Sequence, residues 1–278
     1  PLGRHHHQLP TSYFHMSAAL FHAPKVLEQR LEALAQGLST RDDALGLLAL
    51  GSVGTELTRL DAWSDLDFFV LVREGAKQRY IADLDWLAAA HPLVWHYQNT
   101  ADGRKALMAD GVFCEFAVFE THELRHIPYA PGRFVWRREG VDPALACPEQ
   151  PLPARHDPDW CIGEALSNLM IGLRRHARGE RLAAMRMIQF HALDRVLEYL
   201  ESQQPNSQVA GAARDPFNID RRIERRNPQA AQTLPVWAGG YERTRQAALA
   251  QLELLEAHAV VPACVAEQIR ALADLPSP

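Results

Sequence analysis

The sequence contains no run of eighteen consecutive apolar residues, the length that a helix needs to cross a bilayer. It also does not open with the charged and then apolar segment of a secretory signal. These two absences argue against membrane insertion and secretion. We therefore expect a cytoplasmic location and no membrane partner.

Cysteine, lysine and net positive charge are also scarce. Lysine occurs only at positions 25, 77 and 105, and the formal net charge is -5 at pH 7. Non-specific binding to nucleic acid gains most of its affinity from many basic side chains, so we expect no nucleic-acid partner. The chain has four cysteines without CxxC spacing, which indicates neither a zinc site nor a disulfide framework: Cys114, Cys147, Cys161 and Cys264.

The beginning of the chain is set apart by a histidine run. Residues 1–15 precede Met16 and contain His5, His6 and His7, which is typical of an expression-tag remnant. We leave this segment out of the fold and metal arguments. The whole chain has 278 residues, 47% of them hydrophobic, and is long enough for one large or two smaller domains.

Hydrophobic periodicity divides the chain into a mixed part and a helical part. Helical spacing over 25–38 and 77–90 alternates with short apolar or β-branched runs, which predict strands over 46–50, 66–72, 92–97, 106–108, 112–119 and 134–137. A proline-rich stretch from Pro143 to Pro158 indicates a domain boundary. We therefore predict an α+β fold: residues 16–145 form a mixed sheet flanked by helices, and residues 158–275 form a helical bundle.

The helical part shows apolar stripes that we interpret as bundle core rather than as a cofactor site. One stripe comprises Ile162, Leu166, Leu169 and Leu173. A second set continues the pattern past Gly179 and comprises Leu182, Met185, Gln189, Ala192 and Val196.

The first candidate site is a Gly51-Ser52 turn after an apolar strand, followed by Asp65 and Asp67 on the next one. Residues two apart on a strand share a face, so the two carboxylates project together. Such a pair repels itself unless a cation intervenes, which makes it a natural Mg²⁺ site. Glycine lets a phosphate approach the main chain, and the Ser52 hydroxyl can donate to its oxygens.

A third carboxylate would complete this site by supplying a base. Glu115 lies in the middle of the apolar run 112–119, where an isolated carboxylate is costly unless a metal or a partner compensates. We predict Glu115 as the third member, with Glu120 at the end of the same run as a competitor for that role.

The combination resembles the DNA polymerase β-like nucleotidyltransferase superfamily through Gly51-Ser52 and Asp65-Leu66-Asp67. More narrowly, the chain is similar to the lincosamide nucleotidyltransferases over about residues 22 to 260. The narrower likeness is carried by Leu50-Gly51-Ser52, Trp63 to Val70, Cys114 to Phe119, Asp215-Pro216-Phe217 and Arg221 to Arg226.

The resemblance implies a transfer of a nucleoside monophosphate, AMP from ATP, to a hydroxyl of a small-molecule antibiotic, with release of pyrophosphate. It implies that Asp65, Asp67 and Glu115 bind Mg²⁺, that Gly51 and Ser52 bind the nucleotide, and that Glu115 takes the proton of the hydroxyl. It also implies a possible homodimer.

Alternatives to a lincosamide acceptor stay open. They are an aminoglycoside acceptor, a nucleotide-transferring antitoxin that modifies a protein, and a nucleotide-binding module without turnover. The residues around 158–273 speak against the antitoxin, because such proteins usually lack a large helical domain.

Two weaker signals have ordinary interpretations beside functional ones. Trp95 and Tyr97 share a face of an expected strand and are candidates for an acceptor pocket or for packing. Arginines cluster at two places in the helical part, where they are candidates for phosphate contacts but more typical of a solvated face paired with Glu180 or Glu224: Arg174, Arg175, Arg178 and Arg181, and Arg221, Arg222, Arg225 and Arg226.

Overall fold

The structure is a computed structural model that describes residues 23–203 and 214–276. The tag-like segment 1–15 lies outside the described residues. The chain divides into two compact units, Pro1–Leu152 and Pro153–Pro278. The sequence-based boundaries of 16–145 and 158–275 stay predictions.

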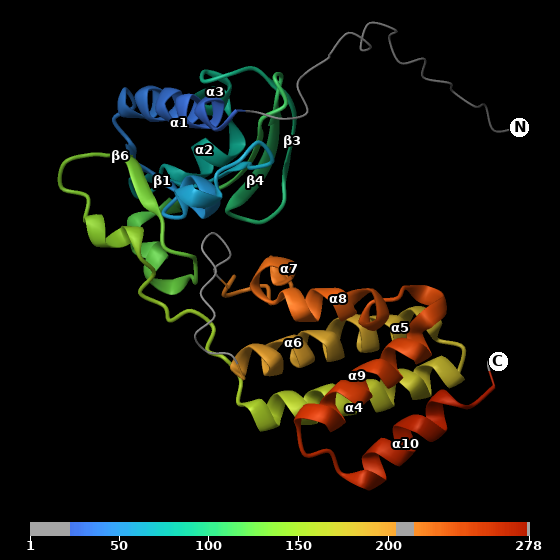
Figure 1. Cartoon of the computed structure of the whole chain (residues 1–278). Coiled ribbons are helices and arrows are strands. Elements are labelled where there is room, and N and C mark those ends of the chain that lie inside the picture. Colours follow the sequence, from blue (N-terminus) through green and yellow to red (C-terminus); the bar gives the residue numbers. More distant parts are fainter. Residues whose placement is uncertain (1–22, 204–213, 277–278) are drawn as a thin grey trace, which may run out of the picture. The chain divides into compact units, whose positions relative to one another are not determined.

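The first unit is built on a six-stranded sheet with the order β3-β4-β5-β2-β1-β6 (Figure 1). The strands are β1 (Ala44–Ala49), β2 (Leu66–Val72), β3 (Leu93–Gln98), β4 (Gly103–Met108), β5 (Phe113–Glu120) and β6 (Arg133–Arg137). β2 and β5 pair in parallel and the other neighbours pair antiparallel, so the sheet is mixed. A parallel pair needs a long crossover, which the residues between β2 and β5 provide.

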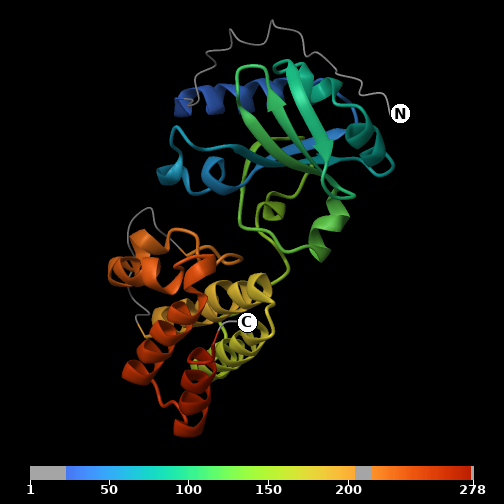
Figure 2. The ribbon, with the colours of Figure 1, turned by 90° about the vertical axis from the view of Figure 1, so that its right-hand side faces the viewer.

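One face of the sheet is covered by helices. These are α1 (Pro24–Ser39), α2 (Lys77–Ala82) and α3 (Asp85–Ala88), and Figure 2 shows α1 lying along the sheet. Because side chains alternate between the two faces of a strand, Leu66, Phe68 and Val70 lie on the helix-covered face, where all three are buried. Phe68 stacks on Phe116 with the ring centroids 5.3 Å apart.

The opposite face is covered by a smaller apolar cluster where β2 and β5 end. Phe69, Leu71 and Phe119 pack there against Leu124 of η4 (Thr121–His126) and against Tyr129. The same cluster includes side chains of η5 (Pro143–Ala146). Asp67 and Glu115 lie at the starts of β2 and β5 on this same face, because they alternate with the buried residues of the helix-covered side.

The second unit is helical. It contains α4 (Pro158–Ala177), α5 (Arg181–Arg186), a π-helical turn η6 (Met187–Ala192), α6 (Leu193–Ser202), α7 (Ile223–Arg226), α8 (Pro228–Trp237), η7 (Tyr241–Arg243), α9 (Thr244–His258) and α10 (Ala263–Ala273). α4, α6 and α9 run side by side around a shared apolar core (Figure 1). The predicted α+β fold followed by a helical bundle is thereby confirmed. Within the described ranges, no helix is both long and apolar enough to cross a membrane.

One stripe predicted for this bundle is wrong in part. Leu182 is 53% exposed, whereas Ala184 and Ile188 are buried. The reason is a break at Gly179, whose φ of 82° ends α4 and lets α5 start in a new phase. The π-helical turn after α5 shifts the buried face again, since it adds a residue to one turn.

Candidate functional site

The Gly-Ser turn lies directly against Asp67. β1 ends at Ala49, and the Leu50 amide donates to the Asp67 carbonyl at 2.8 Å. Gly51 has a φ of 55°, and a Cβ atom at this position would lie 2.9 Å from Oδ2 of Asp67. Both the left-handed backbone and the close approach therefore require glycine here.

The carbonyl groups of this turn accept hydrogen bonds from Arg133, a residue that the sequence did not predict to be part of the site. Gly51 to Val53 form the 3-10 turn η2, and Nε of Arg133 donates to the carbonyls of Val53 and Gly54 at 3.0 and 3.1 Å. Arg133 begins β6, opposite Ala49. A contact across eighty residues leaves no local pattern in the sequence.

Asp67 lies at the start of β2, next to β5, and Asp65 directly precedes this strand. Leu66 of β2 pairs with Cys114, and Asp67 pairs with Glu115 in the next register position. Burial raises the pKa of the Cys114 thiol to about 12, and the negative charges of Asp65 and Asp67 add to this shift. Asp67 is thus next to Glu115 in the sheet, and the joint role of Asp65 and Asp67 stays a prediction.

Glu115 has a partner that the sequence analysis missed. Nζ of Lys105 lies 2.9 Å from Oε2 of Glu115, and the two residues face each other in the β4–β5 pair. This hydrogen bond raises the pKa of the Lys105 ammonium, and the nearby charge of Asp67 adds to the effect. Lys105 is therefore a fixed cation beside the acids at neutral pH.

Glu120, the competitor for the third position, lies at the other end of β5. It pairs with Val72, so it is roughly 17 Å from Glu115 at about 3.3 Å per strand residue. Its Oε1 accepts the Gly75 amide at 2.8 Å, and it forms a capping box with Glu123. Glu120 thus organises the start of η4 and does not join Asp67.

Carboxylates such as those of Asp65 and Asp67 are ligands that Mg²⁺ accepts, and oxygens of the substrate would supply the remaining ligands. In the described part of the chain, no group of three or more acidic, histidine or cysteine side chains is arranged to hold a metal. The Glu115 carboxylate is instead paired with Lys105. Mg²⁺ is commonly bound by one or two carboxylates together with phosphate oxygens and water, so a two-aspartate site meets its needs.

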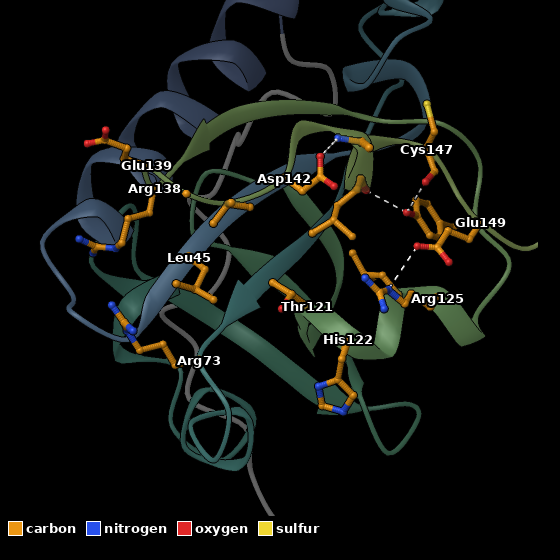
Figure 3. A pocket seen from close by; sticks show the side chains of 16 residues that line it. Leu45, Arg73, Thr121, His122, Arg125, Arg138, Glu139, Asp142, Cys147 and Glu149 are labelled. Atoms are coloured by element: carbon orange, nitrogen blue, oxygen red, sulfur yellow. Dashed lines mark hydrogen bonds and ion pairs between the residues drawn. The ribbon is translucent and has the colours of Figure 1, made fainter.

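A hollow of about 490 Å³ lies elsewhere on the first unit, near the ends of β2 and β5 (Figure 3). Three arginines line it, and each donates to or pairs with a neighbouring group. Arg73 donates to the Asp42 carbonyl, Arg138 to the Ala44 carbonyl, and Arg125 pairs with Glu149. These arginines brace loops, and none of the predicted site residues lines the hollow.

The arginine clusters of the second unit also have carboxylate partners, although not the ones expected. Arg181 pairs with Glu242 at 2.7 Å rather than with Glu180, and Arg226 pairs with Glu201 at 2.8 Å rather than with Glu224. Because these pairs bind the helices of the bundle to one another, they account for the two clusters in part.

Comparison with known proteins gives a limited result. No family model and no curated protein matches the chain. Among solved structures, the chain is similar to an aminoglycoside 6-adenyltransferase from Bacillus subtilis, with 12% identity over 90% of this chain and 93% of that one and a TM-score of 0.30. It is also similar to a nucleotidyltransferase-like protein from Exiguobacterium sibiricum 255-15, with 11% identity over 88% of this chain and 78% of that one and a TM-score of 0.31. Likeness at this level does not place the chain in a family.

Proposed function

We propose that the chain is a magnesium-dependent nucleotidyltransferase. It transfers a nucleoside monophosphate, AMP from ATP, to a hydroxyl of a small-molecule antibiotic of the lincosamide kind and releases pyrophosphate. The observation that carries this proposal is the contact of the Gly51 turn with Asp67, in register with Glu115.

The Gly51-Ser52 turn binds the β- and γ-phosphates of the nucleotide. Glycine leaves the main chain accessible, and the first amides of a short helical turn lack partners within that turn. Arg133 occupies the carbonyls on the other side of the turn, at Val53 and Gly54, and so fixes the direction of its amides. The turn is thereby preorganised for an anion.

Asp65 and Asp67 would hold Mg²⁺ together with the phosphate oxygens. When bound, the ion neutralises the charge that develops on the phosphates as the bond to pyrophosphate breaks. The closeness of Asp67 to the Gly51 turn supports this assignment, because the same turn is proposed to bind the phosphates.

Glu115 takes the proton of the attacking alcohol. The alcohol oxygen forms a bond to the α-phosphorus, the bond from that phosphorus to the bridging oxygen breaks, and pyrophosphate leaves with the electron pair. Glu115 pairs with Asp67 in the sheet, so it would lie close to a phosphate held by Asp67 and could accept the proton of an alcohol there. Lys105 holds the Glu115 side chain in place through its 2.9 Å contact.

The test is mass spectrometry of lincomycin incubated with the protein, ATP and MgCl₂. We expect a product that carries one added AMP, together with an equal amount of pyrophosphate. Kanamycin and the protein itself are analysed in the same way, because an aminoglycoside acceptor or a modified protein would replace the lincosamide in this proposal.

The control is Asp67→Asn, which keeps the size of the side chain and removes its charge. Loss of transfer with an unchanged melting temperature supports the assigned role of Asp67. An absence of AMP transfer from the wild-type protein to any acceptor would remove the proposed activity.

A further inference from the structure

The register of the sheet places two exposed aromatic side chains in line with the candidate site. One residue from each of four neighbouring strands forms a row across the sheet: Asp67, Glu115, Lys105 and Tyr97. A second row lies alongside it and comprises Phe113, Leu107 and Trp95. Both rows end at the edge strand β3 on one face of the sheet, and the first of them begins at the acids.

The aromatic residues of β3 point away from the helix-covered core. His96, between them, pairs with Ala106, which is buried in the core cluster under the helices. Trp95 and Tyr97 therefore project from the other face, where they are 48% and 43% exposed. Their ring centroids lie 5.0 Å apart at an interplanar angle of 49°, so they form one continuous surface.

Single exposed apolar side chains are ordinary, but a paired set aligned with a candidate site is a typical ligand surface. Neighbouring strands are about 4.8 Å apart, so Tyr97, two strands from Glu115, is roughly 10 Å away from it. A small-molecule acceptor spans such a distance.

The chemistry of transfer decides which substrate occupies this surface. In phosphoryl transfer the attacking and leaving oxygens lie roughly in line with the phosphorus. If pyrophosphate leaves at the Gly51 turn, on the β1 side of Asp67, the alcohol approaches from the opposite side. That side contains Glu115, then Lys105, and then the aromatic pair.

We infer that Trp95 and Tyr97 form the acceptor-binding platform of the enzyme. The inference rests on the proposed function, and it assigns these two residues to the acceptor rather than to the nucleotide.

The platform also indicates the chemical class of the acceptor. Aromatic faces bind the apolar face of a ring or an alkyl group. The charged side chain between the platform and Glu115 is Lys105, whose ammonium lies 2.9 Å from Glu115 and disfavours an acceptor amine lying over β4. The preferred acceptor is therefore amphiphilic and carries few positive charges.

The test compares Trp95→Ala and Tyr97→Ala with His96→Ala in steady-state transfer from ATP to lincomycin. We expect the KM for lincomycin to rise about five- to tenfold in each aromatic variant, because a stacking ring contributes up to about 1.5 kcal/mol. The KM for ATP and kcat should change less than about twofold. His96→Ala changes the same strand on the opposite face and should match the wild type.

Trp95→Phe keeps a ring and should recover most of the lost affinity. An unchanged KM for lincomycin in both alanine variants overturns the inference and leaves the proposed function standing. A rise in the KM for ATP instead assigns the rings to the nucleotide and also overturns it. If the wild type transfers AMP to kanamycin in preference to lincomycin, the inferred preference for an acceptor with few positive charges is contradicted. An absence of transfer in the wild type removes the proposed function together with the platform.

Discussion

At the scale of single residues, Gly51 meets two requirements at once: a left-handed backbone and a lack of space beside Asp67. Its φ of 55° is a conformation that other residues adopt at a cost, and a Cβ atom at this position would lie 2.9 Å from Oδ2 of Asp67. No other residue type meets both conditions. The glycine is thus required by the site and not only by the turn.

Gly51→Ala tests this coupling against Gly75→Ala. Gly75 has a φ of 79° and open space around a Cβ atom, so it shares the backbone cost without the close contact. We expect each variant to lose about 1–2 kcal/mol of unfolding free energy in a denaturant titration. AMP transfer should fall by about a hundredfold in Gly51→Ala only, because the new methyl group displaces Asp67. Equal activity of the two variants would show that the contact with Asp67 is unimportant.

His176 on α4 is a second residue with a measurable consequence. It is 6% exposed, and burial lowers the pKa of its imidazole, with the charges of Arg245 and Arg181 acting in the same direction. The folded state therefore favours the neutral ring over the charged one.

A lowered pKa contributes stability that is complete above the unfolded-state value of about 6.5 and is lost as the pH falls through the folded-state value. We expect urea unfolding to show a decrease in stability below about pH 6.5. The slope should be smaller in His176→Gln, whose side chain does not titrate. Identical pH profiles of the two proteins would assign the acid sensitivity to other groups.

At the scale of elements, the sequence located the strands well because alternation and short apolar runs are local signals. The run predicted over 66–72 is β2 (Leu66–Val72), and the Asp110-Gly111 turn connects β4 to β5, with a φ of 94° at Gly111. The sequence missed α8, which begins at Pro228 and contains Pro235, because proline inside a helix argues against one.

The partners of the site residues were not predictable in the same way. Lys105 meets Glu115 only through the register of β4 on β5, and Arg133 meets the Gly51 turn through β6. Such pairings depend on the register between strands that are distant in the chain. The local sequence of one strand does not determine that register. The sequence predicted candidate residues for the chemistry, and the fold was needed to find the residues next to them.

Helix α4 contains two glycines, one closely packed and one open. Substituting each by alanine distinguishes the effect of packing from that of helix propensity. A Cβ atom at Gly172 would lie 2.7 Å from Cγ1 of Ile188 on η6, whereas one at Gly163 meets nothing within 4 Å. We expect Gly172→Ala to lower the unfolding free energy by about 1–3 kcal/mol through overpacking. Gly163→Ala should raise it by about 0.5–1 kcal/mol, since alanine favours the helix.

Thermal and urea unfolding of the two variants measures this difference. A stabilised Gly172→Ala would show that α4 and η6 are less closely packed than described.

At the scale of the whole molecule, the candidate site belongs to the first unit. Gly51, Asp67, Lys105 and Glu115 come from β1 through β5 and their connections, and the sheet register aligns them. The second unit has its own apolar core and its own network of ion pairs. The proposed chemistry therefore depends first on the alignment of strands within one sheet.

The proposed role of Glu115 is tested by comparing Glu115→Gln with Glu120→Gln in AMP transfer from ATP to lincomycin. Both residues lie on β5, but only Glu115 pairs with Asp67. We predict that Glu115→Gln lowers kcat at least about a hundredfold, as expected for the loss of a general base, and that Glu120→Gln stays within a few-fold of the wild type. Retained turnover in Glu115→Gln, with both variants folded, would contradict the role of Glu115 and with it the proposed site.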